Sequence, residues 1–135
     1  VRWVRNFWEI LGCRTVTMTP RKHDNLLARV SHLPHALAAA LVRLSRTDSA
    51  IDLAGPGFAD TTRIASGDPD LWTDIFQTNR EALLKSVDQM IAELSRFRRQ
   101  LKSNDIKAIN RWLATGKKAR DRWLAECHKM KVLPP

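Results

Sequence analysis

The sequence predicts an all-α fold of about five to seven helices, on three observations. Apolar residues recur every three or four positions along residues 79–101, which places one continuous apolar stripe on a helix. A threonine precedes proline at 19–20 and an aspartate precedes proline at 68–69, as capping residues do where helices start. The β-prone run Thr15–Met18 is too short to need a sheet partner.

The other elements follow from stop and turn signals. A first helix is expected over residues 2–12, where apolar residues share one face and Gly12 provides a stop. The helix that starts at Pro20 should be kinked or restarted at Pro34, because proline lacks an amide hydrogen and crowds the preceding turn. Residues 47–57 are rich in turn formers and should connect two helices.

The stretch Pro34–Leu44 is apolar on nearly all sides and is broken only by His35 and Arg43. A helix that is apolar all round is buried all round, either in a core or against another subunit. This stretch therefore predicts a dimer.

The C-terminal part should form one more helical segment. Ser103–Asp105 can cap a last helix, and Gly116 is expected to interrupt that helix before Trp123. The net charge of +9 arises here, because residues 96–135 carry 12 Lys and Arg against 3 Asp and Glu. We interpret this charge as a solvated helical face; the alternative is a basic helical nucleic-acid-binding protein.

Composition bounds the class of protein. At 135 residues and 44% hydrophobic, the chain fits one modest domain with its own core. Two isolated cysteines indicate reduced thiols and a cytoplasmic protein. The longest apolar run, Ala36–Val42, is far too short to span a membrane. Because the sequence begins with Val1 and not with a methionine, we expect the chain to be cut from a longer one.

Three of the four histidines, His23, His32 and His35, fall within thirteen residues. His32 and His35 are three apart, so a helix can place both on one face, and a metal site would then need Asp24 or Cys13 as a third ligand. The spacing matches no strong zinc pattern, so a metal-binding helical bundle stays a minor alternative to histidines that cap or pack. No glycine-rich dinucleotide or triphosphate loop is present.

A second group of polar residues lies at Asp60 and Arg63, which are i,i+3 neighbours on a helical turn and can form an ion pair. At a surface such a pair contributes under about 1 kcal/mol. In a cleft, the planar fork of an arginine matches a carboxylate through two parallel hydrogen bonds. The residues alone leave both interpretations open.

Several motifs together resemble one known family. They are Phe7-Trp8-x-x-Leu11-Gly12, His23-Asp24, Ser31-His32-Leu33-Pro34-His35, Gly57-Phe58-x-Asp60-Thr61-Thr62-Arg63-Ile64-Ala65, Leu71-Trp72 and Asn79. In this order and spacing the chain resembles the C-terminal domain of the prephenate and arogenate dehydrogenases from about residue 3 to residue 95. The basic segment 95–135 matches less distinctly, and we take 1–135 as one such domain.

The resemblance implies an activity that composition does not reveal. Members of this family oxidise prephenate or arogenate with NAD or NADP and release carbon dioxide, on the way to tyrosine. A Rossmann-type N-terminal domain binds the cofactor, and an all-α C-terminal domain interlocks with its twin in a homodimer. The hydride-transfer histidine belongs to the N-terminal domain, so the resemblance implies no catalytic residue and no turnover in these 135 residues alone.

The resemblance also implies a substrate-binding set, carried over by position. Arg63 corresponds to the substrate-carboxylate ligand and Asp60 to its partner in a polar network. The remaining positions are polar or aromatic residues on the substrate side: Asp24, Ser31, His32, His35 and Trp72. Ala59 stands where the family often has a basic residue, so one contact in the cleft is lost or altered. A purely structural helical dimerisation module remains the alternative.

Overall fold

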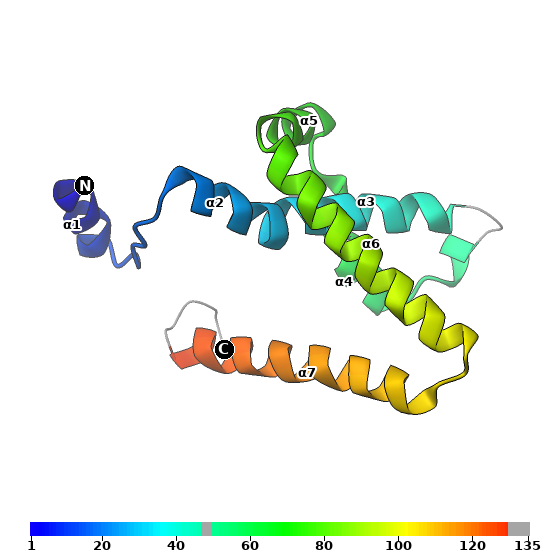
Figure 1. The fold of residues 1–135 in the computed structure, drawn as a ribbon. Coiled ribbons are helices and arrows are strands. Elements are labelled where there is room, and N and C mark those ends of the chain that lie inside the picture. Colours follow the sequence, from blue (N-terminus) through cyan, green and yellow to red (C-terminus); the bar gives the residue numbers. More distant parts are fainter. Residues whose placement is uncertain (47–49, 130–135) are drawn as a thin grey trace. The chain divides into compact units, whose positions relative to one another are not determined.

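The computed structural model describes residues 1–46 and 50–129, and within them every regular element is helical (Figure 1). The predicted all-α class is confirmed. In chain order the α-helices are α1 (Arg2–Ile10), α2 (Pro20–Leu27), α3 (Leu33–Ser45), α4 (Pro56–Thr62), α5 (Pro69–Thr78), α6 (Arg80–Lys102) and α7 (Ile106–Lys129). Shorter turns lie between them: the π-helical turn η1 (Ala28–His32) and the 3-10 turns η2 (Ala50–Leu53) and η3 (Arg63–Ser66).

Three predicted capping side chains hold the starts of helices. The Thr19 hydroxyl accepts a hydrogen bond from the first turn of α2 at 3.3 Å. The Asp68 carboxylate accepts from two amides at the start of α5, at 2.8 and 3.2 Å. The Asp105 carboxylate accepts a hydrogen bond from one amide in the first turn of α7 at 2.9 Å. Each cap satisfies amides that have no partner inside their own helix.

The interruption expected at Pro34 is present as a change of helix type. α2 passes into the π-helical turn η1, and α3 begins at Leu33 with Pro34 in its first turn, so that the three follow one another along nearly one line (Figure 1). Proline cannot donate to the carbonyl four residues earlier, and its ring crowds that carbonyl. The wider π-helical turn lets the chain continue as a helix beyond that point.

The stop predicted at Gly12 is confirmed, because α1 ends at Ile10 and Gly12 follows the cap residue Leu11 at φ +79°. The interruption expected at Gly116 was wrong. α7 runs without interruption through Gly116 to Lys129. A glycine inside a helix costs only about 1 kcal/mol relative to alanine, and the rest of a 24-residue helix outweighs that cost.

The chain forms two compact units, residues 1–87 and 88–135. In the first, the buried apolar residues are few and mostly small: Ala28, Leu33, Ala38 and Leu83. In the second, Phe97 of α6 stacks on Trp112 of α7 with ring centroids 4.8 Å apart, and the Trp112 indole donates to Glu93 at 3.4 Å.

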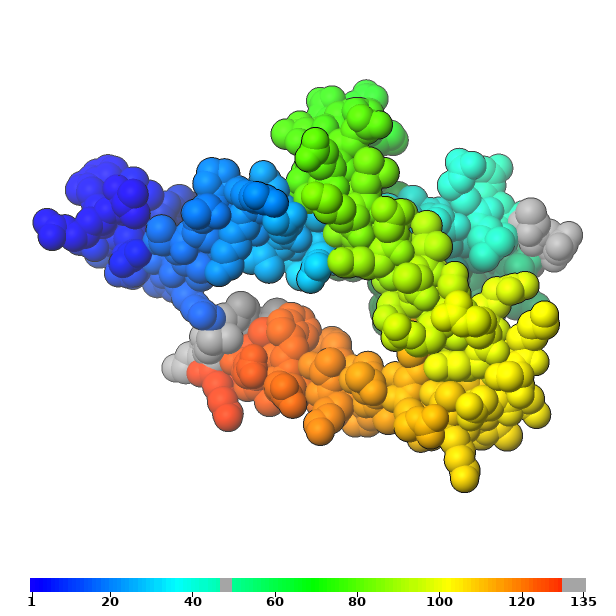
Figure 2. All heavy atoms as spheres, in the orientation of Figure 1, coloured from blue at the N-terminus to red at the C-terminus, as the bar shows by residue number. Residues whose placement is uncertain are grey.

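The predicted apolar faces are only partly covered. Of α3, expected to be buried all round, only Leu33 and Ala38 are buried, and Leu44 is 72% exposed. Along the stripe of α6, Leu83 is buried but Leu94 and Leu101 are about half exposed, at 49% and 53%. α1 buries no residue, and its side chains form the dark-blue surface in Figure 2. Among the described residues no large side chain is fully buried.

The Asp68 cap gives a prediction about stability. Asp68→Ala should lower the free energy of unfolding by about 0.5–2 kcal/mol, because two amides of α5 lose their acceptor. Urea unfolding followed by circular dichroism measures this loss. Asp74→Ala, which removes an exposed carboxylate inside the same helix, is the matched control and should change stability far less. Equal effects of the two substitutions would contradict the capping role.

Candidate functional site

Trp72, on α5, is the centre of an aromatic cluster in the first unit. The His35 ring stacks on the indole with centroids 3.4 Å apart and an interplanar angle of 24°. His32 meets the same indole edge-on, with centroids 6.4 Å apart, and Phe76 lies 5.7 Å from it. Three residues predicted for the site, His32, His35 and Trp72, are therefore in one place.

Gly67 makes room for this indole. A Cβ atom at position 67 would lie 2.5 Å from Nε1 and 2.8 Å from Cδ1 of Trp72, closer than any real Cβ contact. The indole therefore packs directly on the backbone of residue 67 and is held between that backbone and the His35 ring. No pattern in the sequence points to Gly67, because only the fold brings it against Trp72.

A cavity of about 410 Å³ opens beside the cluster. Its lining combines aromatic, aliphatic and small residues with one cation: His35, Ala39, Arg43, Ile64, Ala65, Gly67, Pro69, Trp72, Thr73 and Phe76. Arg43 was missed as a site residue. The signal was available, because positions 35, 39 and 43 lie four apart and so share one face of α3. Pockets of this kind suit a small, partly apolar ligand with a negative charge.

Backbone and side-chain hydrogen bonds fix both imidazoles. The Asn79 side-chain nitrogen lies 2.8 Å from the backbone oxygen of Asp24 and 3.2 Å from Nδ1 of His32. Nδ1 of His35 lies 3.1 Å from the backbone oxygen of Ser31. Asp24 and Ser31 thus contribute to the cluster through their main chains. The Asp24 carboxylate contacts His23 instead, at 3.1 Å.

Burial lowers the pKa of His32 below its usual value of 6.5. The neighbouring rings of His35 and His23 lower this pKa further, and the Asp24 carboxylate opposes them. His32 is 7% exposed, so its charged form would lose most of its hydration. The ring is therefore neutral at physiological pH.

Arg63 and Asp60 lie apart from the aromatic cluster. Arg63 begins η3, its side chain is exposed, and it does not line the 410 Å³ cavity, although the next two residues, Ile64 and Ala65, do. Asp60, on α4, is exposed too. In the described part of the chain these two side chains form no ion pair with each other. The guanidinium is therefore exposed to solvent, and the cavity is lined by its sequence neighbours and not by Arg63 itself.

No metal site accompanies the histidines within residues 1–46 and 50–129. No group of three or more histidine, cysteine, aspartate or glutamate side chains there is arranged to hold an ion. Nδ1 of both His32 and His35 is already engaged. The minor metal alternative therefore has no ligand set in this part of the chain.

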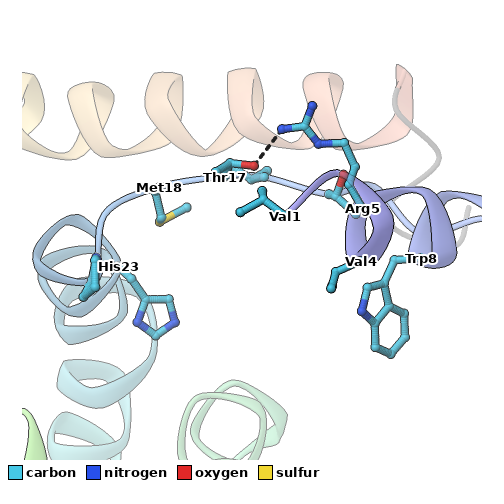
Figure 3. A pocket seen from close by; sticks show the side chains of 10 residues that line it. Val1, Val4, Arg5, Trp8, Thr17, Met18 and His23 are labelled. Carbon is cyan, nitrogen blue, oxygen red and sulfur yellow. Dashed lines mark hydrogen bonds between the residues drawn. The ribbon is translucent and has the colours of Figure 1, made fainter.

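A second hollow, of about 650 Å³, lies between α1, the extended segment that follows it and the start of α2 (Figure 3). Val1, Val4, Trp8 and Met18 give it an apolar lining, and Arg5 crosses to Thr17 with a hydrogen bond of 2.8 Å. Of the predicted histidines only His23 lines it. It holds none of the predicted substrate-binding residues.

The lowered pKa of His32 predicts a pH dependence of stability. The folded state binds fewer protons at His32 than the unfolded state, so the free energy of unfolding should fall as the pH drops below about 6.5 toward the folded pKa. Urea unfolding at a series of pH values measures this. His32→Gln should flatten the dependence in that window, whereas His23→Gln, at an exposed position, should flatten it less. A wild-type slope retained in His32→Gln would contradict the assignment.

Comparisons with known proteins identify the family of this chain. Residues 19–115 match the family model described as prephenate dehydrogenase, dimerization domain. The chain is 38% identical over 112 residues to the cyclohexadienyl dehydrogenase of Zymomonas mobilis, covering 78% of this chain and 38% of that protein. It is 32% identical over 126 residues to the prephenate dehydrogenase of Bacillus subtilis, covering 90% of this chain and 34% of that protein.

Solved structures give the same answer. The arogenate dehydrogenase of Synechocystis superposes with a TM-score of 0.84 at 30% identity, covering 90% of this chain and 46% of that one. The prephenate dehydrogenase of A. aeolicus, in complex with hydroxyphenyl propionate and NAD+, gives 0.76 at 32% identity, covering 90% and 44%. The chain thus spans less than half the length of these relatives. It belongs to the prephenate dehydrogenase dimerization-domain family.

Proposed function

We propose that this chain is the substrate-binding and dimer-forming half of an NAD- or NADP-dependent prephenate or arogenate dehydrogenase, a cytoplasmic enzyme of tyrosine biosynthesis. The observation that carries the proposal is the cavity beside Trp72 and His35, in a domain of this family. A planar aromatic wall and a nearby cation suit an anionic ring compound. The free thiols of Cys13 and Cys127 suit a reducing compartment.

In this proposal Arg63 binds a carboxylate of the substrate. Prephenate carries two carboxylates, and the guanidinium offers a planar pair of donors that matches one of them. Asp60, three residues earlier, orients that guanidinium once the cleft closes. Arg43, at the cavity itself, is a second cation for the same dianion. Ala59 supplies no charge where the family often has a basic residue, so Arg43 can compensate electrostatically.

The aromatic cluster holds the rest of the substrate. Trp72 covers one side of the ligand and excludes water, which strengthens charge interactions nearby. His35 forms a hydrogen bond with a polar group of the ligand. Ser31, His32 and Asp24 support the cluster from behind, through the hydrogen bonds that fix the two imidazoles.

NAD or NADP would supply the hydride acceptor, and a separate nucleotide-binding half would hold it. The residues of this chain do not themselves fit a dinucleotide, since no glycine-rich phosphate loop follows a strand here. We therefore expect these 135 residues to bind substrate weakly and to turn over none. The role of this chain is to orient the anion and exclude water.

Dimerisation is proposed from exposed apolar surface. Leu94 and Leu101 on α6 are about half exposed and Leu44 on α3 is 72% exposed, on helix faces whose pattern predicted burial. Burying apolar area contributes about 25 cal/mol per Å², so covering several leucines on each protomer gives a substantial driving force. A second copy of the chain is the occupant that the family's description names. In the described residues no helix is long and apolar enough to cross a lipid bilayer.

The substrate role is tested in a chimera. Residues 1–135 replace the matching part of the Zymomonas cyclohexadienyl dehydrogenase, and reduction of the cofactor by prephenate or arogenate is followed. Arg63→Ala should lower kcat/KM roughly 10- to 100-fold, the loss expected for a hydrogen-bonded charge pair. Arg63→Lys keeps the charge without the fork and should recover only part of the loss.

Arg98→Ala, at an exposed arginine of α6, is the matched control and should leave kcat/KM unchanged. An Arg63→Ala chimera with unchanged kcat/KM and an intact dimer would favour the purely structural dimerisation module instead.

The dimer is tested by sedimentation. The wild-type chain at micromolar concentration should sediment at twice its 15.4 kDa. Leu94→Glu should shift the equilibrium toward monomer, because a charge then enters an apolar interface. Gln89→Glu places the same charge at an exposed polar position of α6 and should leave the dimer intact. A stable wild-type monomer would contradict the proposal.

A further inference from the structure

The hydrogen bonds around the two imidazoles determine which ring nitrogen of each carries the hydrogen. A neutral imidazole has one N–H donor and one lone-pair acceptor, and a fixed partner on Nδ1 decides the assignment. Both rings have such a partner on Nδ1, but the two partners are of opposite kinds.

For His35 the partner is an acceptor. The backbone oxygen of Ser31, at 3.1 Å, has no hydrogen to donate, so Nδ1 of His35 must carry the hydrogen. In the neutral ring Nε2 is then left with a lone pair. His35 lines the 410 Å³ cavity, with its face against Trp72.

For His32 the partner is a donor. The Asp24 backbone oxygen can only accept hydrogen bonds, so the Asn79 side chain directs its amide nitrogen at this oxygen, 2.8 Å away. The same nitrogen lies 3.2 Å from Nδ1 of His32 and has a second hydrogen to give. Nδ1 of His32 must therefore accept, which leaves the hydrogen of the neutral ring on Nε2.

Nε2 of His35 is available to a ligand in the cavity that His35 lines. Among the described residues, Gln100 Oε1 is the one side-chain polar atom that is both buried and without a hydrogen-bond partner. Nε2 of His32 and Nε2 of His35 have no protein partner either, so each must keep some contact with solvent. The charged and titratable groups near His32 are His35, His23 and Asp24.

We infer that Asn79 and the Ser31 carbonyl lock His32 and His35 in opposite tautomers, so that the hydrogen of His32 is on Nε2 and His35 offers a lone pair on Nε2 to a ligand in the cavity. Asn79 is thus a positioning residue, since it acts through His32. His35 can accept a hydrogen bond from a hydroxyl or amine group of such a ligand. This role in substrate selection rests on the function proposed above, whereas the tautomers themselves do not.

The test is long-range ¹H–¹⁵N NMR of the histidine rings in the ¹⁵N-labelled chain at about pH 8, well above the ordinary imidazole pKa. In the wild type, the protonated nitrogen should be Nε2 in His32 and Nδ1 in His35. His32→Gln and His35→Gln assign the signals. If His32 and His35 show the same tautomer in the wild type, that result alone overturns the inference.

Asn79→Asp supplies the second arm. It replaces the donor amide by an acceptor of the same shape, so His32 should move its hydrogen to Nδ1 while His35 stays unchanged. Asn25→Asp adds the same charge at an exposed position one residue from Asp24 and should move neither ring. An unchanged His32 tautomer in Asn79→Asp would also overturn the inference. An inactive chimera with the expected tautomers would count against the proposed function alone.

Discussion

The first unit depends on the side chain of Asn79, whose amide nitrogen reaches Asp24 and His32, 55 and 47 residues earlier in the chain. Asn79 sits at the break between α5 and α6, with φ −110° and ψ 31°, which frees its side chain from either helix surface. One amide therefore ties the end of α5 to both α2 and the π-helical turn. Asn79 is half-buried and both hydrogens of its amide are used, so losing the amide would leave two acceptors without this donor.

The π-helical turn explains how two histidines three residues apart meet one indole in different ways. His32 ends the π-helical turn and His35 lies in the first turn of α3. The helix therefore changes type between these two residues. His32 approaches Trp72 edge-on, and His35 stacks on its face. Gly67 completes the arrangement by letting the indole lie on the backbone. Pro34 has a direct part in the site, because it prevents a regular α-helix at this point.

Features of the fold that depend on neighbouring residues could be predicted from the sequence. Features that depend on contacts between distant residues could not. The three capping side chains and the restart at Pro34 act within a few residues and were predicted correctly. The interruption at Gly116 was not, since a small local penalty is outweighed by a long helix. In the site, His35 and Trp72 came from the family resemblance. Gly67 needed the three-dimensional contact with Trp72, which no local pattern encodes, whereas Arg43 was missed although it shares one face of α3 with His35.

The exposed state of Arg63 follows from the energetics of a half-formed site. Burying a guanidinium without a partner costs several kcal/mol, and in the described residues no carboxylate pairs with Arg63. If Arg63 binds substrate as proposed, its guanidinium must therefore stay hydrated until an anion binds. Trp72 and His35 differ from Arg63, because stacking their rings on each other before a ligand binds costs little free energy. In the proposed enzyme the apolar part of the site is preformed, and the charged part is completed by the ligand and the second domain together.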